Sequence, residues 1–302
     1  LALWNGQDPI LKERPFGLGN PEGNHGEDLK DYYFHIANTP THSFMRGLYK
    51  YPQQRFPYEQ LLEENRRRGR DQTEYELVDT GIFDQSRYFD VFIEYAKASP
   101  DDIAIRIRAV NRGPDPAPLT LLPTLWLRNT WSWGYPDEHE HPMQLDGDAV
   151  QATVGGGVGT YRLTCHEQGS WLFTDNESNT QRLFQKPNAR SFQKDGFHRY
   201  LIDGEQEAIN PAQRGTKAAR HLQRTLQPGE EWQVDLRLSG PASSSDAQAS
   251  NTDVDLLFRA REKEWREFFD SRVPHLSDED RLIHSSAAAG LLWCKKYYGW
   301  SV

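Results

Sequence analysis

Cysteine and methionine are scarce in this chain of 302 residues, which contains two of each. Cys165 and Cys294 lie far apart, and neither has a His or Cys neighbour at the spacing of metal ligands. This pattern argues against a disulfide framework and indicates two free, buried thiols. Long apolar runs are missing as well, since none approaches the roughly 18 to 20 residues of a membrane-spanning helix, and the mean hydropathy is −0.82. We therefore expect no membrane partner.

The chain also lacks an excess of positive charge. Its net charge at pH 7 is −9 and its isoelectric point is about 5.6. The Lys and Arg residues form no long cationic face, and their densest run is the short RRRGR at Arg66 to Arg70. We interpret that run as the solvated end of a helix. An acidic chain of this kind is a poor match for nucleic acid, so we predict no nucleic-acid partner.

Common signatures of catalytic and metal centres are absent too. The chain has no GxSxG elbow, no HExxH pair and no EF-hand loop, and its GGGVG run lacks the GK[ST] ending of a phosphate loop. His139 and His141 stand in an acidic loop without further zinc ligands at a defined spacing. No two carboxylates are recognisable as the acid and base of a sugar-cleaving enzyme. We predict no catalytic residue, metal or cofactor in this chain.

Strand-like segments, in contrast, fill the sequence from Glu74 to about Leu238. Each is enriched in β-branched or aromatic residues, and several alternate with period two. Turn residues connect them, and no helical segment long enough for a parallel crossover lies between them. The fold class we predict is mainly β, an antiparallel super-β-sandwich followed by a C-terminal pair of linker helices. The predicted strands fall in 75–83, 88–99, 102–113, 119–131, 149–154, 160–168, 170–175, 198–203, 220–227 and 231–239.

Helical signals flank this region. A short helix is predicted near 57–69, and two amphipathic helices follow a linker rich in Ser and Ala, the second opening at Ser277. We therefore divide the chain into a β-sandwich domain (1–240), a flexible linker (241–252) and linker helices (253–302). These helices have little left to pack on, which suggests an adaptor leading into a further helical domain.

Two segments are candidates for a binding site. Gly17 to Phe44 packs three histidines, four carboxylates and four glycines into a stretch without a clean period. Leu122 to Tyr135 starts as a strand and ends in Arg and Asn side chains between tryptophans, a combination suited to sugar hydroxyls and pyranose faces. The second segment could equally be an aromatic sheet edge that seals a domain interface. The candidate sugar-binding residues are Asn24, His25, Glu27, Asp28, Arg128, Asn129, Trp131 and Trp133.

Three long segments carry a family resemblance. Residues 1–53, 79–103 ("DTGIFDQSRYFDVFIEYAKASPDDI") and 122–134 ("LPTLWLRNTWSWG") resemble the N-terminal region of the large bacterial members of glycoside hydrolase family 63. Those proteins are relatives of the mannosyl-oligosaccharide glucosidase that trims N-glycans in eukaryotes. The resemblance runs nearly from Leu1 to Val302.

The resemblance implies a fold and a role. In that family, linker helices join an N-terminal super-β-sandwich to an (α/α)6 barrel, which carries the Asp acid and Glu base of an inverting mechanism. No carboxylate of this chain matches that pair, so no catalytic residue is carried over. The implied role is a noncatalytic sandwich of an α-glucosidase-like enzyme. Its implied partners are the (α/α)6 catalytic domain of the same polypeptide and an oligosaccharide or small glucoside, whose pocket the two candidate segments would shape.

Two alternatives from other classes stay open. One is a free-standing carbohydrate-binding module, and the other is a mutarotase-like sandwich enzyme built on His25, His42 and Glu27. Burial of the apolar helix face around Val254 and Trp265 by the sandwich itself would indicate a self-contained chain, whereas a bare face would indicate a missing partner. Both ends read as cuts through a longer polypeptide. No signal peptide is visible, which favours a cytoplasmic protein.

Overall fold

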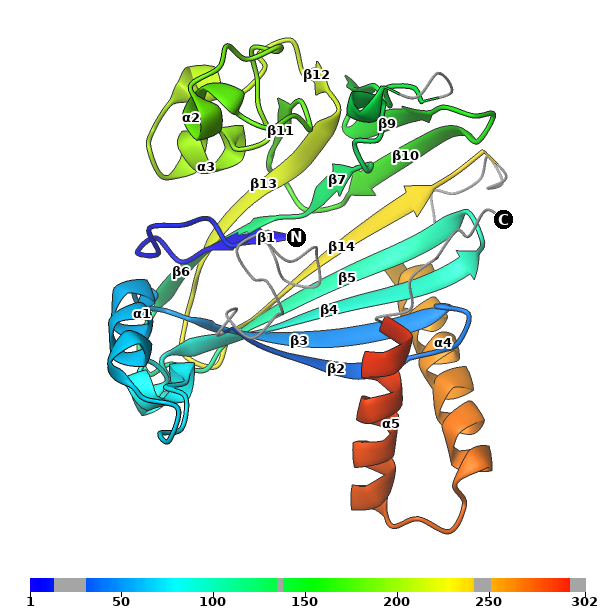
Figure 1. The fold of residues 1–302 in the computed structure, drawn as a ribbon. Coiled ribbons are helices and arrows are strands. Elements are labelled where there is room, and N and C mark those ends of the chain that lie inside the picture. The colour runs from blue at the N-terminus through cyan, green and yellow to red at the C-terminus, as the bar shows by residue number, and fades with distance from the viewer. Residues whose placement is uncertain (14–30, 135–137, 242–250, 294–302) are drawn as a thin grey trace, which may run out of the picture.

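The computed structural model describes residues 1–13, 31–134, 138–241 and 251–293, which form two antiparallel β-sheets with helices on their outer faces (Figure 1). The predicted fold class is confirmed. One sheet has the order β1 (Ala2–Trp4), β6 (Ala117–Leu122), β13 (Lys217–Leu226) and β11 (Ser170–Thr174), with β7 (Thr124–Trp126) also on β13. The other has the order β12 (Arg214–Gly215), β8 (Met143–Asp146), β9 (Ala149–Val154), β10 (Gly159–Cys165), β14 (Glu231–Ser239), β5 (Asp102–Asn111), β4 (Tyr88–Ser99), β3 (Phe44–Pro52) and β2 (Tyr32–Asn38).

The core lies between the two sheets and follows from period-two alternation. In β4, Phe89, Val91 and Ile93 point inward and are at most 1% exposed. They meet residues of the five-stranded sheet such as Leu121 and Phe173 in one apolar cluster. Burying each such side chain stabilises the fold by roughly 1.5–3 kcal/mol, which fixes the register of the central strands.

Helices cover the outer face of the five-stranded sheet, where the sequence predicted another strand. Residues 198–201 belong instead to α3 (Gly196–Leu201), which follows α2 (Thr180–Phe184), and residues 202–203 form a turn at its end. Phe197 of α3 is fully buried, and Tyr200 and Leu201 pack with it against the sheet. This i, i+3, i+4 spacing is typical of a helix. Three apolar positions are too few to distinguish a helix from a strand in the sequence.

A second predicted strand, 75–83, is also wrong. The chain there forms the 3-10 turns η1 (Leu77–Thr80) and η2 (Asp84–Ser86), after α1 (Tyr58–Arg67), which lies where a short helix was predicted. A reciprocal capping box between Glu76 and Asp79 stabilises the start of η1. Such side-chain to backbone bonds offer the chain an alternative to the sheet ladder. Further 3-10 turns are η3 (Trp131–Trp133) and η4 (Gln206–Ala208).

Strands β2 and β3 form a hairpin that the sequence did not predict. Strand β2 lies within the Gly17 to Phe44 segment, and β3 begins at its last residue. The pairing register shifts between His35 and Ala37, so a bulge interrupts the alternation of β2. This bulge accounts for the missing period in that part of the sequence. Asn24, His25, Glu27 and Asp28 lie outside the described residues.

The C-terminal helices pack on the nine-stranded sheet, contrary to the expectation that they have little to pack on. From α4 (Asn251–Arg272), Val254, Phe258, Trp265 and Phe269 are all at most 8% exposed. Their partners on the sheet are Phe44 and three alanines, Ala37, Ala96 and Ala104, whose small side chains allow close approach. The apolar face of α4 is therefore covered by the sandwich itself.

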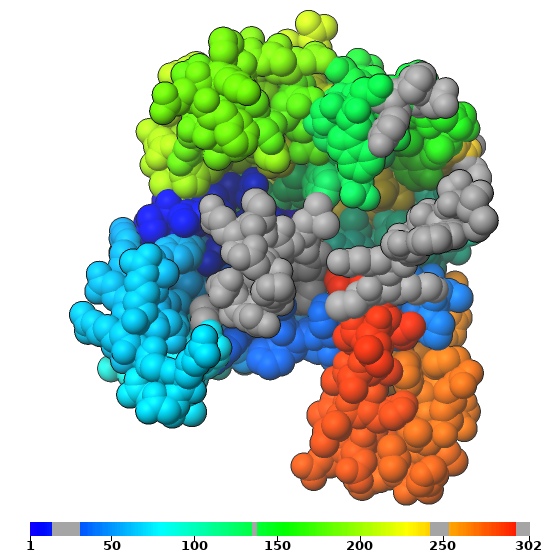
Figure 2. All heavy atoms as spheres, viewed as in Figure 1, coloured from blue at the N-terminus to red at the C-terminus, as the bar shows by residue number. Residues whose placement is uncertain are grey.

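The second C-terminal helix, α5 (Asp278–Trp293), packs against β2, the edge strand of the same sheet. It begins after Ser277 as predicted, because the Ser277 hydroxyl accepts a hydrogen bond from the backbone N–H of Asp280 at 3.1 Å. Figure 2 shows the two helices as a lobe that projects from the body of the sandwich. Residues 242–250, most of the predicted linker, lie outside the described residues.

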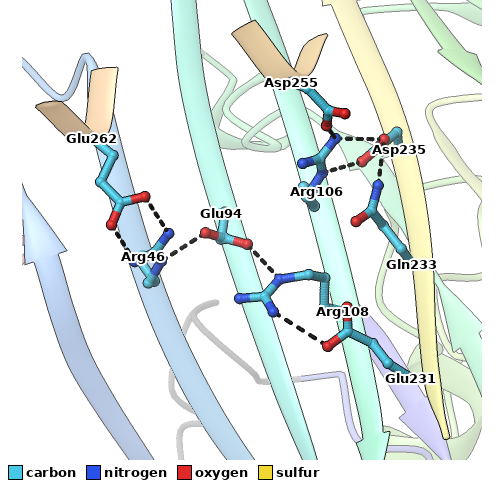
Figure 3. Close-up of polar contacts among 9 residues, drawn as sticks. All are labelled: Arg46, Glu94, Arg106, Arg108, Glu231, Gln233, Asp235, Asp255 and Glu262. Carbon is cyan, nitrogen blue, oxygen red and sulfur yellow. Dashed lines mark hydrogen bonds and ion pairs between the residues drawn. The ribbon is translucent and has the colours of Figure 1, made fainter. Parts of the chain in front are cut away.

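Charged side chains attach α4 to the sheet beside the apolar contacts (Figure 3). Glu262 of α4 pairs with both terminal nitrogens of Arg46 at 3.1 and 3.2 Å. Arg46 also donates to Glu94 at 2.6 Å, and Arg108 donates to the other oxygen of Glu94 at 2.9 Å. Glu94 is 3% exposed, so this acid at the centre of the chain of ion pairs is buried between strands and helix.

Two smaller expectations concern thiols and membranes. Cys165 is a free, buried thiol as predicted, and burial raises its pKa to about 11, so it stays protonated at neutral pH. Cys294 lies outside the described residues. None of the helices within the described ranges is both long and apolar enough to cross a membrane.

Candidate functional site

The segment after β7 is the one that the sequence singled out. Hydrogen bonds hold it to the chain that follows β11. Asn129 donates from Nδ2 to the carbonyl of Asn176 at 2.8 Å, and Asn176 donates in return to the carbonyl of Leu127 at 2.8 Å. The Asn129 side-chain oxygen accepts from the N–H of Ser132 at 3.1 Å. Both ends of the Asn129 amide are thus used within the protein, and this residue positions the segment.

The two tryptophans differ in their surroundings. Trp131 donates from Nε1 to Glu177 at 2.8 Å, and its ring lies nearly perpendicular to that of His141, with centroids 5.6 Å apart. Trp133 is 53% exposed, and the Arg128 guanidinium lies 5.0 Å from its ring centroid. Trp131 is therefore held in place by contacts within the protein, whereas Trp133 and Arg128 present an exposed stacking surface.

A cleft of about 590 Å³ lies beside this segment. Strands β8, β9 and β12 supply one wall, and the chain after β11 and the loop around residue 190 supply the others. Trp131 bonds to Glu177, two residues after the cleft residue Asp175, and touches His141, which follows the cleft residue Glu140. Polar lining residues are Glu140, Gln144, Gln151, Thr153, Asp175, Arg190, Ser191, Asn210, Arg214 and Thr216.

The residues that line the cleft carry charges of both signs. Arg190 pairs with Glu140. Burial raises the pKa of Asp175, the positive charge of Arg190 lowers it, and the negative charges of Glu140 and Glu177 raise it, with a net increase. Among the described residues, no group of three His, Cys, Asp or Glu side chains is arranged to hold a metal ion. The cleft can thus offer hydrogen bonds from neutral and charged groups, including two carboxyl groups, of which Glu140 is paired with Arg190.

The structure brings only some of the predicted site residues together. Asn129 and Trp131 bond to Asn176 and Glu177, close in sequence to the cleft residue Asp175, but none of Arg128, Asn129, Trp131 and Trp133 is itself among the residues that line the cleft. His42, the one described member of the mutarotase-like cluster, lies in the turn between β2 and β3. Strand β2 is at the opposite edge of the nine-stranded sheet from β12 and β8, which line the cleft. The described end of the Gly17 to Phe44 segment therefore lies away from the tryptophan segment along this sheet.

Sequence reasoning missed most of the cleft. Asp175 was read as the end of a strand, while Arg190 and Arg214 fall in stretches without a periodic pattern. The available signal was a run of polar residues at the end of β11, Asp175 to Asn179, which is longer than a tight turn requires.

Comparison with known proteins gives one close relative in sequence. No protein-family model matches the chain. The chain is 36% identical over 344 aligned positions to the "Uncharacterized protein YMR196W" of Saccharomyces cerevisiae. The alignment covers the whole chain, and the chain spans 32% of the length of that relative. The resemblance to glycoside hydrolase family 63 stays a prediction.

Solved structures give weaker similarities, and the three reported next are named as enzymes that act on carbohydrates. A protein described as a kojibiose phosphorylase from human microbiome matches with a TM-score of 0.35 and 8% identity, over 86% of this chain and 25% of that one. A protein described as an aldose 1-epimerase of Escherichia coli K12 matches at 0.29 and 7%, over 68% and 67%. A polysaccharide lyase matches at 0.33 and 13%, over 81% and 33%. At these TM-scores a shared activity does not follow.

Proposed function

We propose that the chain is a noncatalytic, carbohydrate-binding β-sandwich domain of an inverting, α-glucosidase-like glycoside hydrolase. The observation that carries the proposal is the polar cleft, close to whose lining Trp131 bonds to Glu177, with the exposed Trp133 two residues further along the chain. Its volume falls within the roughly 300–1,000 Å³ typical of small-molecule sites. A sugar ring has an apolar face and a rim of hydroxyls, so it suits an aromatic surface beside amide and charged side chains. The family resemblance adds the enzyme class.

The proposed domain partner finds support on α5. Leu282, Ile283 and Leu291 of this helix are 60%, 62% and 79% exposed. Exposed apolar residues that gather on one element often mark an interface. The apolar face of α4 around Val254 and Trp265 was expected to be bare if a partner domain is missing. The sandwich covers it, and this observation by itself favours a self-contained chain. We therefore assign the interface with the catalytic domain to α5 and keep the free-standing binding module as the alternative.

Sugar binding by the isolated chain is the first test. In calorimetric titration with maltose at pH 7.5, we expect the wild-type chain to bind and Trp133→Ala to weaken the affinity roughly 2- to 10-fold, the loss expected when one aromatic contact is removed. Leu62→Ala is the matched control, because Leu62 of α1 is equally exposed, at 54%. Its affinity should equal that of the wild type. No binding by the wild type, or equal binding by Trp133→Ala, would contradict the site.

Hydrolysis tests the noncatalytic role. A panel of α-glucosidic disaccharides is incubated with this chain and with a longer polypeptide that includes the proposed (α/α)6 domain, and NMR identifies the anomer released. We expect cleavage by the longer polypeptide alone, with β-sugar released from the α-bond, as inversion requires. Cleavage by the chain itself would mean that a catalytic carboxylate pair lies within these residues and that the proposed role is wrong.

A further inference from the structure

We infer that Asp175 is the residue that selects the ligand of the cleft, accepting hydrogen bonds from adjacent hydroxyl groups of a neutral sugar. This inference rests on the proposed sugar-binding function and goes beyond it, because it names the recognising group and the ligand chemistry. The cleft needs a fixed acceptor to which no donor of the described residues bonds. Asp175 meets both requirements.

The backbone around Asp175 is held on both sides. Its own N–H donates to the carbonyl of Phe192 at 2.9 Å, and the N–H of Asn176 donates to the Thr216 hydroxyl at 2.7 Å. Strand β12 lies directly against the end of β11, since a Cβ on Gly215 would stand 2.2 Å from the Thr174 carbonyl oxygen. A side chain on such a backbone is positioned before the ligand arrives, which lowers the entropy lost on binding.

The Asp175 carboxylate is also open. Within the described ranges no donor bonds to it, although it is partly buried and lines the cleft. The neighbouring acids, in contrast, have partners in the protein. Glu140 pairs with Arg190, Glu177 accepts from Trp131, and Glu138 accepts from the Thr130 hydroxyl. A free carboxylate can accept from two donors at once, and vicinal sugar hydroxyls present two donors side by side.

The balance of charge favours a neutral ligand. A cationic ligand would meet Arg190 and Arg214, and an anionic ligand would meet Glu140 and Asp175 itself. Gln144 and Gln151 line the wall formed by β8 and β9 and offer uncharged amide groups. These groups together match hydroxyls better than an ammonium, carboxylate or phosphate group.

A pH dependence follows from the surroundings of Asp175. Burial raises the pKa of Asp175, the positive charge of Arg190 lowers it, and the negative charges of Glu140 and Glu177 raise it, so that the net effect is an increase. Arg214 of β12 is a further charged residue that lines the cleft. Protonation removes the negative charge and turns one acceptor oxygen into a donor. Affinity should therefore be full at pH 7.5 and fall as the pH drops through a range in which an ordinary Asp remains ionised.

The test is calorimetric titration of wild type, Asp175→Asn and Asp146→Asn with maltose, glucose and glucosamine between pH 7.5 and 4.5. Asp146 of β8 is the control, an exposed acid that pairs with Arg162 at 2.6 Å outside the cleft lining. We expect Asp175→Asn to bind maltose about 10- to 100-fold more weakly at pH 7.5, as for loss of a charge-assisted hydrogen bond, and to lose the pH dependence. Asp146→Asn should match the wild type in both respects.

Each other outcome has a defined meaning. Wild-type binding with unchanged affinity and pH profile in Asp175→Asn would overturn the inference and leave the proposed function standing. Tighter binding of glucosamine than of glucose would overturn the assignment of a neutral ligand. Absence of binding by the wild type would overturn the proposed function and the inference together. Thermal unfolding of Asp175→Asn should match the wild type, because no described hydrogen bond to the carboxylate is lost.

Discussion

Replacing Glu94 by Gln should lower the free energy of unfolding by about 3 kcal/mol. Glu94 is 3% exposed and accepts from Arg46 and Arg108, which bring charge from the strands on either side of β4 (Figure 3). Removing one partner of a buried ion pair costs more than the pair contributes, because the remaining charge is left desolvated. The usual cost is about 3–5 kcal/mol. We expect the lower end, since Arg46 keeps Glu262 and Arg108 keeps Glu231.

The measurement is urea denaturation at pH 7.5, with Glu231→Gln as the matched control. Glu231 also pairs with Arg108, at 3.4 Å, but its side chain is 45% exposed. Exposed pairs contribute only about 0–1 kcal/mol, so the control should unfold close to the wild type. Equal effects of the two substitutions would contradict the prediction, because burial of Glu94 would then not determine its contribution to stability.

The sheet was predictable from sequence where one face of each strand is apolar. In β5, Ile107 and Ala109 are buried while Arg106 and Arg108 point to the other face, so period two is visible in the residues themselves. Prediction failed where local chemistry competes with this pattern. A capping box at Glu76 replaced one predicted strand, and the bulge after His35 hid a real one.

The candidate site was predictable only in part, for a different reason, and none of its predicted residues that the structure describes is among those that line the cleft. Trp131 and Trp133 stand close in sequence to Arg128, so the composition of one segment pointed to them. Asp175 and Arg214 are brought together by the contact between β11 and β12. That neighbourhood depends on sheet topology, which local patterns do not encode. Likewise, alternation placed Glu94 on the polar face of β4 without revealing that α4 covers it.

Replacing Trp265 by Ala should cost about 3–5 kcal/mol of stability. Trp265 is 8% exposed and lies at the centre of the contact between α4 and the sheet, with ring centroids 6.2 Å from Phe44 and 5.9 Å from Phe269. The alanines of the sheet surface beneath it offer no bulky side chain that could move into the space left behind. The cavity should therefore stay open and loosen α4.

Two measurements separate this effect from general damage. Urea denaturation gives the loss of stability, and amide hydrogen exchange should show that protection falls first in α4 and α5, since these helices depend on the contact while the core between the sheets does not include it. Leu256→Ala on the same helix is the control, because Leu256 is 57% exposed and its loss should change stability by about 0.5 kcal/mol or less. A Trp265→Ala chain as stable as this control would contradict the prediction, because the other apolar contacts and the ion pairs of α4 would then hold it without Trp265.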